Sequence, residues 1–327
     1  METQAVWVTE KNHVEILPLE IATEPAPDEV QIDTRACGIC AWDSAMYQGI
    51  TGPGEPPYAI GHEAAGVITK VGSMVKDFKV GDKASVCSAT YSVHMAKTVN
   101  NKASGLCRLP DDTEDWAAAV YEPTNCVVNL LALSEIEAGD RVVVVGCGYM
   151  GLLTLMGLVN GSQAGEVIAF EINEDRCEMA RKIGVKEVHG MGADGVFEGY
   201  EDLMKRGGAD VVIDFTTGEA GFQFAMSCLK AKAGKLIIGS WHRQKLTIDA
   251  SVWHLGGITI KNLSPMSNPH YEDIIPRTGV LIEKGVYDPG MLVSHVMNYK
   301  DPELNHLFEI SISKKENYMK GIVLFDD

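Results

Sequence analysis

Short runs of apolar residues, separated by Gly, Pro and Asp, characterise the first third of the chain. Three such runs lie at residues 30–36, 66–71 and 83–87, and the turn sequence Val80-Gly81-Asp82 precedes the third. Apolar runs of this length between turn residues predict β-strands. Many short strands at this spacing are typical of a barrel-like β domain, which we therefore expect here.

The pattern changes after about residue 122 to an alternation of helices and strands. Four consecutive valines, residues 142–145, predict a strand buried on both faces of a parallel sheet. Further strands are predicted at 166–170, 210–214 and 235–239, and helices at 126–133, 152–159 and 174–183. This alternation is the signature of a doubly wound α/β fold.

The end of the chain returns to mixed character. The pattern predicts a strand at 295–298, a short helix at 303–309 and a final strand at 320–325. A chain of 327 residues is long enough to divide into two domains. We expect a discontinuous catalytic domain, residues 1–125 and 265–327, interrupted by a nucleotide-binding domain, residues 126–264.

A glycine-rich motif, residues 146–151, follows the strand of valines and opens the next predicted helix. Its spacing is G-x-G-x-x-G, which in this strand–turn–helix context predicts a dinucleotide-binding loop. The first glycine permits a tight turn, the second lets the backbone approach the pyrophosphate, and the third allows close helix–strand packing. We expect cofactor contacts from Gly146, Gly148, Tyr149, Met150 and Gly151.

An acidic residue ends the strand that follows this motif. Glu171 lies 20 residues after Gly151, where a carboxylate accepts hydrogen bonds from the adenosine ribose. Because a carboxylate repels a 2′-phosphate, the sequence predicts NAD as the cofactor. Arg176 either flanks the adenosine or is a surface charge on the helix.

Three separate segments carry residue types that bind metals. Cys40 lies in the segment CGICAWD, His62 and Glu63 lie in GHEAAG, and Glu122 precedes a proline. A catalytic zinc is bound by three protein ligands from Cys, His and carboxylate side chains, and it keeps a fourth position open. The inventory of Cys40, His62 and a glutamate fits such a site.

The spacing of Cys37 and Cys40 also occurs in redox pairs and in structural zinc sites. A redox pair is disfavoured because no thioredoxin-like strand and helix surround these residues. A structural zinc site is disfavoured because it needs four ligands, and the sequence has no second C-x-x-C motif.

Taken together, these motifs resemble the zinc-containing medium-chain dehydrogenases, a family that includes alcohol, sorbitol and threonine dehydrogenases. The matching stretches are residues 37–43, 61–72, 80–82, 122–123 and 142–151 with Glu171, and residues 210–218 and 234–239 extend the match. The resemblance implies a GroES-like catalytic domain joined to a Rossmann domain.

The resemblance also assigns roles to residues of the metal segments. It implies that Cys40 and His62 are zinc ligands, and that Asp43 orients the zinc histidine. Glu122 falls where the sorbitol dehydrogenase branch carries a glutamate, and Glu63 matches the family's alternate glutamate, which approaches the metal during ligand exchange. Which of the two is the resting third ligand stays open.

The chain departs from the family in the segment that carries a structural zinc. Relatives have four closely spaced cysteines in this lobe, whereas this chain has only Cys87 and Cys107 nearby. We therefore expect one zinc per chain.

A second departure concerns the proton relay. The family usually has Ser or Thr two residues after the zinc cysteine, and often His three residues further on; Trp42 and Ala45 occupy those positions here. Ser44, Tyr47, His94 or a chain of waters could substitute, and the sequence does not choose among them.

Charge and composition exclude several classes of partner. The net charge of −17 argues against nucleic acid and anionic membranes, which need basic patches. No apolar run approaches the roughly 18 residues of a membrane span, and the N-terminus lacks the pattern of a signal peptide. We expect a cytoplasmic protein without a disulfide framework.

The expected activity is hydride transfer between NAD and a secondary alcohol that zinc, as a Lewis acid, acidifies. The glutamate branch favours a polyol, sugar or cyclitol as substrate, and we expect a homodimer or homotetramer. The alternatives are a zinc-free quinone or enone reductase and a nucleotide-binding protein that has lost catalysis. The pairs Trp241-His242 and Trp253-His254 either line a pocket or are core aromatics beside surface histidines.

Overall fold

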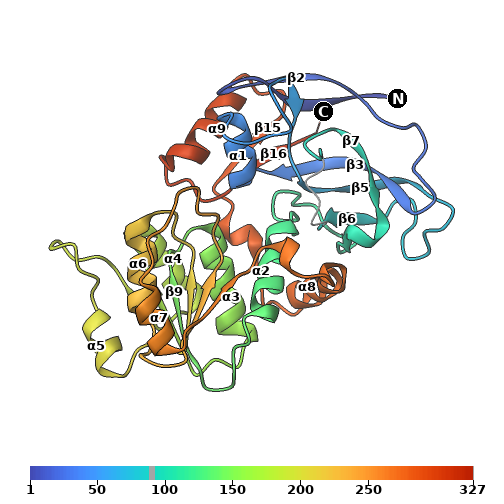
Figure 1. The fold of residues 1–327 in the computed structure, drawn as a ribbon. Coiled ribbons are helices and arrows are strands. Elements are labelled where there is room, and N and C mark those ends of the chain that lie inside the picture. The colour runs from blue at the N-terminus through green and yellow to red at the C-terminus, as the bar shows by residue number, and fades with distance from the viewer. Residues whose placement is uncertain (88–92, 327) are drawn as a thin grey trace. The chain divides into compact units, whose positions relative to one another are not determined.

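The structure, a computed structural model, describes residues 1–87 and 93–326 and divides into two compact units (Figure 1). The first unit comprises Met1–Asn125, His270–Glu283 and Asp288–Asp327. The second comprises Cys126–Pro269 and Lys284–Tyr287. Each unit has its own sheet system and hydrophobic core, and each is described separately.

The first unit is mainly β, as the run of short apolar segments predicts. Its described residues form a three-stranded antiparallel sheet of order β2-β1-β4 and a seven-stranded sheet of order β15-β16-β3-β5-β6-β8, with β7 paired to β3. The strands are β1 (Glu2–Glu10), β2 (His13–Glu20), β3 (Glu29–Gly38), β4 (Tyr58–Ala59), β5 (Glu63–Val71), β6 (Lys83–Val86), β7 (Thr98–Lys102), β8 (Leu106–Arg108), β15 (His295–Asn298) and β16 (Gly321–Leu324).

Strand register in this unit fixes the frame of the candidate metal site. On β3 and β5, Cys37 pairs with Ala64 and Gly38 pairs with Glu63. On the other side of β3, Gly38 pairs with Ile322 of β16. The end of β3, the start of β5 and the start of β16 therefore lie side by side, although they come from distant parts of the chain.

Helices of the first unit follow or flank these strands. They are α1 (Ala41–Tyr47), α8 (Ile274–Glu283) and α9 (Leu304–Ser313), with short 3-10 helices at Ala103–Gly105, Tyr271–Asp273 and Pro289–Leu292. The long α2 (Glu122–Leu133) contains the boundary between the units, after Asn125. Aromatic stacking joins α1 to α9, because the rings of Tyr47 and Phe308 are 5.2 Å apart.

The second unit confirms the predicted alternation of strands and helices. Its described residues form a six-stranded parallel sheet of order β11-β10-β9-β12-β13-β14. The strands are β9 (Arg141–Val145), β10 (Glu166–Phe170), β11 (Glu187–His189), β12 (Val211–Asp214), β13 (Lys235–Ile238) and β14 (Thr259–Asn262). The helices are α3 (Tyr149–Gly161), α4 (Glu174–Ile183), α5 (Tyr200–Lys205), α6 (Glu219–Ser227) and α7 (Ala250–Gly256), with a 3-10 helix at Pro265–Ser267.

The four valines of β9 lie at the centre of this sheet. All four are at most 2% exposed, because β10 and β12 flank the strand and helices cover the faces. Strand order runs outward from β9 in both directions, so this is the point at which a doubly wound sheet reverses its connections.

The return to the first unit differs from the expected boundary at residue 265. The chain leaves the second unit after Pro269, and just before this point Asn268 donates a 2.7 Å hydrogen bond to Asn129 on α2. Lys284–Tyr287 also belongs to the second unit, where the side chain of Asn160 on α3 donates to the carbonyl of Val286. Local side-chain contacts of this kind leave no mark in the hydrophobic pattern.

Among the described residues, no helix combines the length and the apolar character that crossing a membrane requires.

Candidate active site

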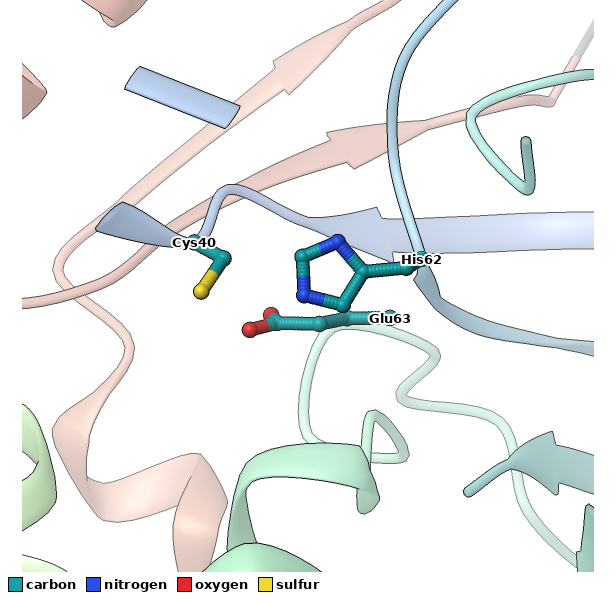
Figure 2. Close-up of side chains that lie close together, drawn as sticks. All are labelled: Cys40, His62 and Glu63. Atoms are coloured by element: carbon teal, nitrogen blue, oxygen red, sulfur yellow. The ribbon is translucent and has the colours of Figure 1, made fainter. Parts of the chain in front are cut away.

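Three side chains of the first unit converge on one point. One donor atom from each of Cys40, His62 and Glu63 lies within 4.8 Å of the others. Figure 2 shows the sulfur, the imidazole ring and the carboxylate directed toward a shared space. Three ligands of one zinc ion at metal distances of about 2.0–2.3 Å lie roughly 3–4 Å apart. The donor set and its spacing therefore fit a zinc ion.

The local fold explains why these residues meet. Cys40 is the N-cap of α1, two residues after the end of β3. His62 and Glu63 stand at the start of β5, which pairs with the end of β3. Cys40 is half-buried, and His62 and Glu63 are 5% and 2% exposed, so a bound ion would be largely shielded from water.

Asp43 fixes both halves of this arrangement. Its fully buried carboxylate accepts hydrogen bonds from the backbone N–H of Cys40 (2.8 Å) and of Gly61 (3.1 Å). The same carboxylate lies 3.4 Å from Nδ1 of His62. This contact directs Nε2 of the ring toward the metal position, in the way that carboxylates orient metal-binding histidines.

The charges of the site follow from burial and mutual contact. Burial by itself lowers the pKa of His62, but the neighbouring Asp43 and Cys40 raise it well above its usual value. Burial raises the pKa of the Cys40 thiol, partly offset by His62. A metal ion must displace protons from these groups, because its ligands are a thiolate and a neutral imidazole.

Lys320 is a functional candidate that the sequence does not point out. It is 3% exposed, and its ammonium forms an ion pair with the carboxylate of Glu63 and donates to the carbonyl of Ile39 (3.1 Å). In the sequence it is merely the residue that precedes the apolar strand β16. The one sequence feature that could have identified Lys320 is its place directly before a buried strand. Lysines are common at strand ends, so this feature does not distinguish a functional residue.

A missing side chain makes room for this ion pair. A Cβ atom on Gly38 would lie 2.1 Å from the carboxylate of Glu63 and 3.0 Å from Cε of Lys320. Glycine at the end of β3 is therefore required by close approach.

Glu122 lies apart from the converging group. It is the first residue of α2 and is 6% exposed, but its carboxylate does not belong to the group of three described residues that meets the metal-site distances. Its neighbours anchor it in the first unit, because the Tyr121 N–H donates to Ser85 and the Asn125 side chain donates to the carbonyl of Cys87.

The other residues around Cys40 have structural surroundings. Cys37 is fully buried in the core of the β unit, and all eight cysteines are free thiols. Trp42 packs at the edge of the same core, and Ala45 is fully buried.

The three candidates for a substitute proton relay are all buried. Ser44 shares a 2.8 Å hydrogen bond with Ser311 and donates to the carbonyl of Cys40. Burial, and then the charge of Glu309, raises the pKa of Tyr47 to about 12. Burial, and then His62, lowers the pKa of His94 to about 3, so its ring stays neutral near pH 7. The cysteine-poor segment that departs from the family begins at residues 88–92, which lie outside the described residues.

The glycine motif of the second unit has the geometry that its spacing predicts. Gly146 has a φ of +94°, and a Cβ on Gly151 would lie 2.0 Å from the carbonyl oxygen of Gly146. A Cβ on Gly148 would meet no atom within 4 Å, so the backbone there borders open space. Gly148 caps α3, whose free N–H groups favour an anion. The loop therefore fits the pyrophosphate of a dinucleotide.

Glu171 follows β10 beside this loop and is 4% exposed. Its carboxylate accepts hydrogen bonds from the N–H groups of Cys147, Ile172 (2.8 Å) and Asn173 (2.9 Å). It thus ties the glycine loop to the end of the next strand. Arg176 lies in the first turn of α4 and is half-buried, as are Tyr149 and Met150 at the start of α3.

Two family models match the chain. Residues 26–119 match the alcohol dehydrogenase GroES-like domain, and residues 150–277 match the zinc-binding dehydrogenase domain.

Curated relatives match over most of their length. A zinc-type alcohol dehydrogenase-like protein of Escherichia coli K12 is 26% identical over 96% of both chains. The (R,R)-butanediol dehydrogenase of Bacillus subtilis is 26% identical over 89% of this chain and 90% of its own. A sorbitol dehydrogenase of Arabidopsis thaliana is 24% identical over 95% and 92%, respectively.

Solved structures share the fold. An E. coli oxidoreductase of unknown specificity superposes with a TM-score of 0.86 at 22% identity, over the whole of both chains. An alcohol dehydrogenase of E. coli CFT073 in complex with NADH superposes with a TM-score of 0.83 at 19% identity, over 99% of both chains. Both family models and the full-length relatives lead to one conclusion: the chain belongs to the zinc-containing medium-chain dehydrogenase/reductase family.

Proposed function

We propose that this protein is a zinc-dependent dehydrogenase that transfers hydride between a secondary alcohol and NAD. The observation that carries the proposal is the convergence of Cys40, His62 and Glu63 on one shielded point. A thiol, an imidazole and a carboxylate are the donor types of a catalytic zinc, which keeps a position open for substrate.

The chain's own residues would hold and orient the metal. Cys40 and His62 are two ligands in this proposal. Asp43 holds both in place, because its carboxylate contacts the ring of His62 and accepts a hydrogen bond from the backbone N–H of Cys40. Glu63 and Glu122 both stay candidates for the third ligand. The ion pair with Lys320 argues against Glu63 as a permanent zinc ligand. To bind the metal, the carboxylate of Glu63 would have to share its charge between the metal and the ammonium group, or break the ion pair.

When bound, zinc supplies Lewis acidity that lowers the pKa of an alcohol on its open position, and NAD supplies the hydride acceptor. The burial of His62 and Glu63 keeps bulk water from the ligands. Asp43 would hold the His62 ring in the orientation that a metal ligand needs.

We assign cofactor binding to Gly146, Gly148, Tyr149, Met150 and Gly151, with Glu171 and Arg176 toward the adenosine. NAD is favoured over NADP because the buried carboxylate of Glu171 directly follows β10, where it would repel a 2′-phosphate.

Polyols, sugars or cyclitols are the favoured substrates in this proposal. The support is the glutamate at position 122 and the names of two relatives, a butanediol and a sorbitol dehydrogenase. Butanediol with adjacent hydroxyls and sorbitol both present a secondary alcohol beside a second oxygen. We further propose a homodimer or homotetramer in the cytoplasm, which sizing and cell fractionation test directly.

Elemental analysis and a turnover screen test the proposal together. We expect about one zinc per chain, from the ligand inventory of a single catalytic site. With NAD, polyols should react faster than simple alcohols and amino alcohols. Zinc-free protein that reduces quinones or enones, or zinc-loaded protein that binds NAD but oxidises no alcohol, would contradict it, and two zinc ions per chain would mean an additional structural site.

A further inference from the structure

A second buried polar cluster lies in the nucleotide-binding unit, at the carboxyl ends of β12 and β13. Asp214 is fully buried at the end of β12. One carboxylate oxygen accepts hydrogen bonds from the N–H (2.8 Å) and the hydroxyl (2.7 Å) of Thr216. The other oxygen lies 2.8 Å from Nε2 of His242, whose side chain is 6% exposed.

The sequence left the pair Trp241-His242 open between a pocket lining and a core aromatic beside a surface histidine. The structure shows the reverse of a core aromatic beside a surface histidine: Trp241 is 46% exposed, whereas the His242 ring is buried. The ring packs edge-on against Phe222, with the ring centroids 5.7 Å apart.

The contact with Asp214 fixes the tautomer of His242. A carboxylate can only accept, so Nε2 donates to Asp214, and in the neutral form of the ring Nδ1 is then an acceptor. Nδ1 is buried and has no hydrogen-bond partner among the described residues. Buried acceptors are rarely left unpaired in folded proteins, so this atom is available to a donor from outside the chain.

The position of the cluster in the sheet indicates which part of a bound cofactor would supply this donor. The sheet reverses its connections at β9, and ligands of such sheets bind beyond the carboxyl ends of the strands at this point. The glycine loop and Glu171 follow β9 and β10, which is the side for the adenosine half and the pyrophosphate. His242 follows β13, which lies on the other side of β9 from β10. This is the side on which the nicotinamide half of the cofactor would lie.

We propose that His242 binds the nicotinamide half of the cofactor, with Nδ1 accepting a hydrogen bond from the carboxamide N–H or from a hydroxyl of the adjoining ribose. Asp214 is the positioning residue that holds the ring. The inference rests on the proposed NAD-linked function. Residues 239–249 contain no helix or strand, so the segment that carries the ring is coil that follows the sheet.

A purely structural role has different consequences. In that case the ring only fastens the coil to the sheet, in the way that the carboxylate of Glu219 accepts from the N–H of Thr247 (3.0 Å) and the Gln223 side chain donates to the Thr247 carbonyl. Loss of the ring would then lower stability without a specific effect on the nicotinamide half.

Two substitutions separate these roles. His242→Gln places an amide N–H near Nε2, which keeps a donor toward Asp214 but removes the acceptor at Nδ1. His242→Asn does the reverse, because its shorter amide places an oxygen near Nδ1. We expect affinity for NADH in the order wild type, His242→Asn, His242→Gln, with a loss of about 3- to 10-fold for His242→Gln, the effect of one neutral hydrogen bond. Resistance to urea should follow the other order, with His242→Gln above His242→Asn.

Calorimetric titration with ADP, ADP-ribose and NADH locates the contact without any turnover. ADP affinity should be unchanged in both variants. If a variant loses affinity for NADH alone, His242 contacts the carboxamide. If it loses affinity for ADP-ribose as well, His242 contacts the ribose. Both results support the proposal. Unchanged NADH affinity, or equal loss for all three ligands, would overturn it.

A measurement on the unmodified protein covers the case in which a variant fails to fold. In nitrogen-15 histidine spectra, a buried unprotonated ring nitrogen should shift with NADH and not with ADP, and the absence of such a shift would overturn the proposal. Failure of the proposed function is distinguishable, because wild-type protein would then either show no affinity for NADH or bind NADH without oxidising any alcohol, and neither result depends on His242.

Discussion

The ammonium of Lys320 and the carboxylate of Glu63 form an ion pair that is almost completely buried, with side-chain exposures of 4% and 2%. The two residues are 257 positions apart in the chain. The pair sits against Gly38 and beside the donor atoms of Cys40 and His62, so it adds a resident cation to the candidate metal site. A zinc ion and Lys320 would both stabilise the charge of Glu63.

Removing this ammonium should destabilise the protein. Lys320→Met leaves the carboxylate of Glu63 buried without its cation, which costs about 3–5 kcal/mol in comparable pairs. Zinc should recover part of the loss, because the metal replaces the missing positive charge. Urea unfolding of chelator-treated and zinc-loaded protein measures both effects. Lys315→Met, an exposed lysine near the same segment, is the control. A free energy of unfolding equal to that of the wild type would contradict the assignment of this ion pair.

The two cysteines of the C-x-x-C segment should behave differently. Cys40→Ser should abolish turnover and zinc retention, because zinc affinity depends on the thiolate. Cys37→Ser should keep zinc and most activity. It places a hydroxyl in the core and should lower stability by about 1–3 kcal/mol. Zinc analysis and an NAD turnover assay of both variants determine which cysteine is the ligand. If Cys37→Ser were inactive while Cys40→Ser kept its zinc, the ligand assignment would be wrong, and the roles of Trp42, Asp43 and Ala45 with it.

Asp43 should control zinc affinity without touching the metal. Asp43→Asn weakens the contact with Nδ1 of His62 and one of the two backbone hydrogen bonds that the carboxylate accepts. Loss of such an orienting carboxylate typically lowers metal affinity about 10- to 100-fold. Competition with a chromophoric chelator measures the change, and the rate should fall with it. Asp28→Asn, an exposed residue paired with Lys102, serves as the control. Equal zinc affinity in Asp43→Asn and wild type would show that the ring is oriented by other contacts.

Glu171 should determine the choice between NAD and NADP. Glu171→Ala removes the carboxylate that would repel a 2′-phosphate, so the preference for NAD, as the ratio of kcat/KM values, should fall by about tenfold or more. NAD affinity should fall too, because the N–H groups of Cys147, Ile172 and Asn173 lose their acceptor. Glu174→Ala, on the exposed first turn of α4, should change neither quantity. Equal catalytic efficiency of the unmodified enzyme with both cofactors would refute the assignment.

The elements with strong periodicity were predictable from the sequence. The bounds of β10, α4 and β15 agree residue for residue with the hydrophobic pattern, and the valines of β9 lie at the centre of the sheet. The edge strands β2 and β14 were missed because most of their side chains are exposed or half-buried and the apolar contrast is weak. The central strand β1 was also missed, although Ala5, Val6 and Val8 are fully buried.

What the sequence determined by itself is the set of local chemistries. A glycine motif between strand and helix, and Cys40, His62 and Glu63 at family spacing, follow from residue type and short-range order. Tertiary structure alone decided which distant polar groups meet. The register of β3 against β5 and β16 places Lys320 on Glu63, and the parallel alignment of β12 and β13 places His242 on Asp214. The physical reason is that buried polar pairs depend on packing across strands, which neither hydrophobic periodicity nor local spacing encodes.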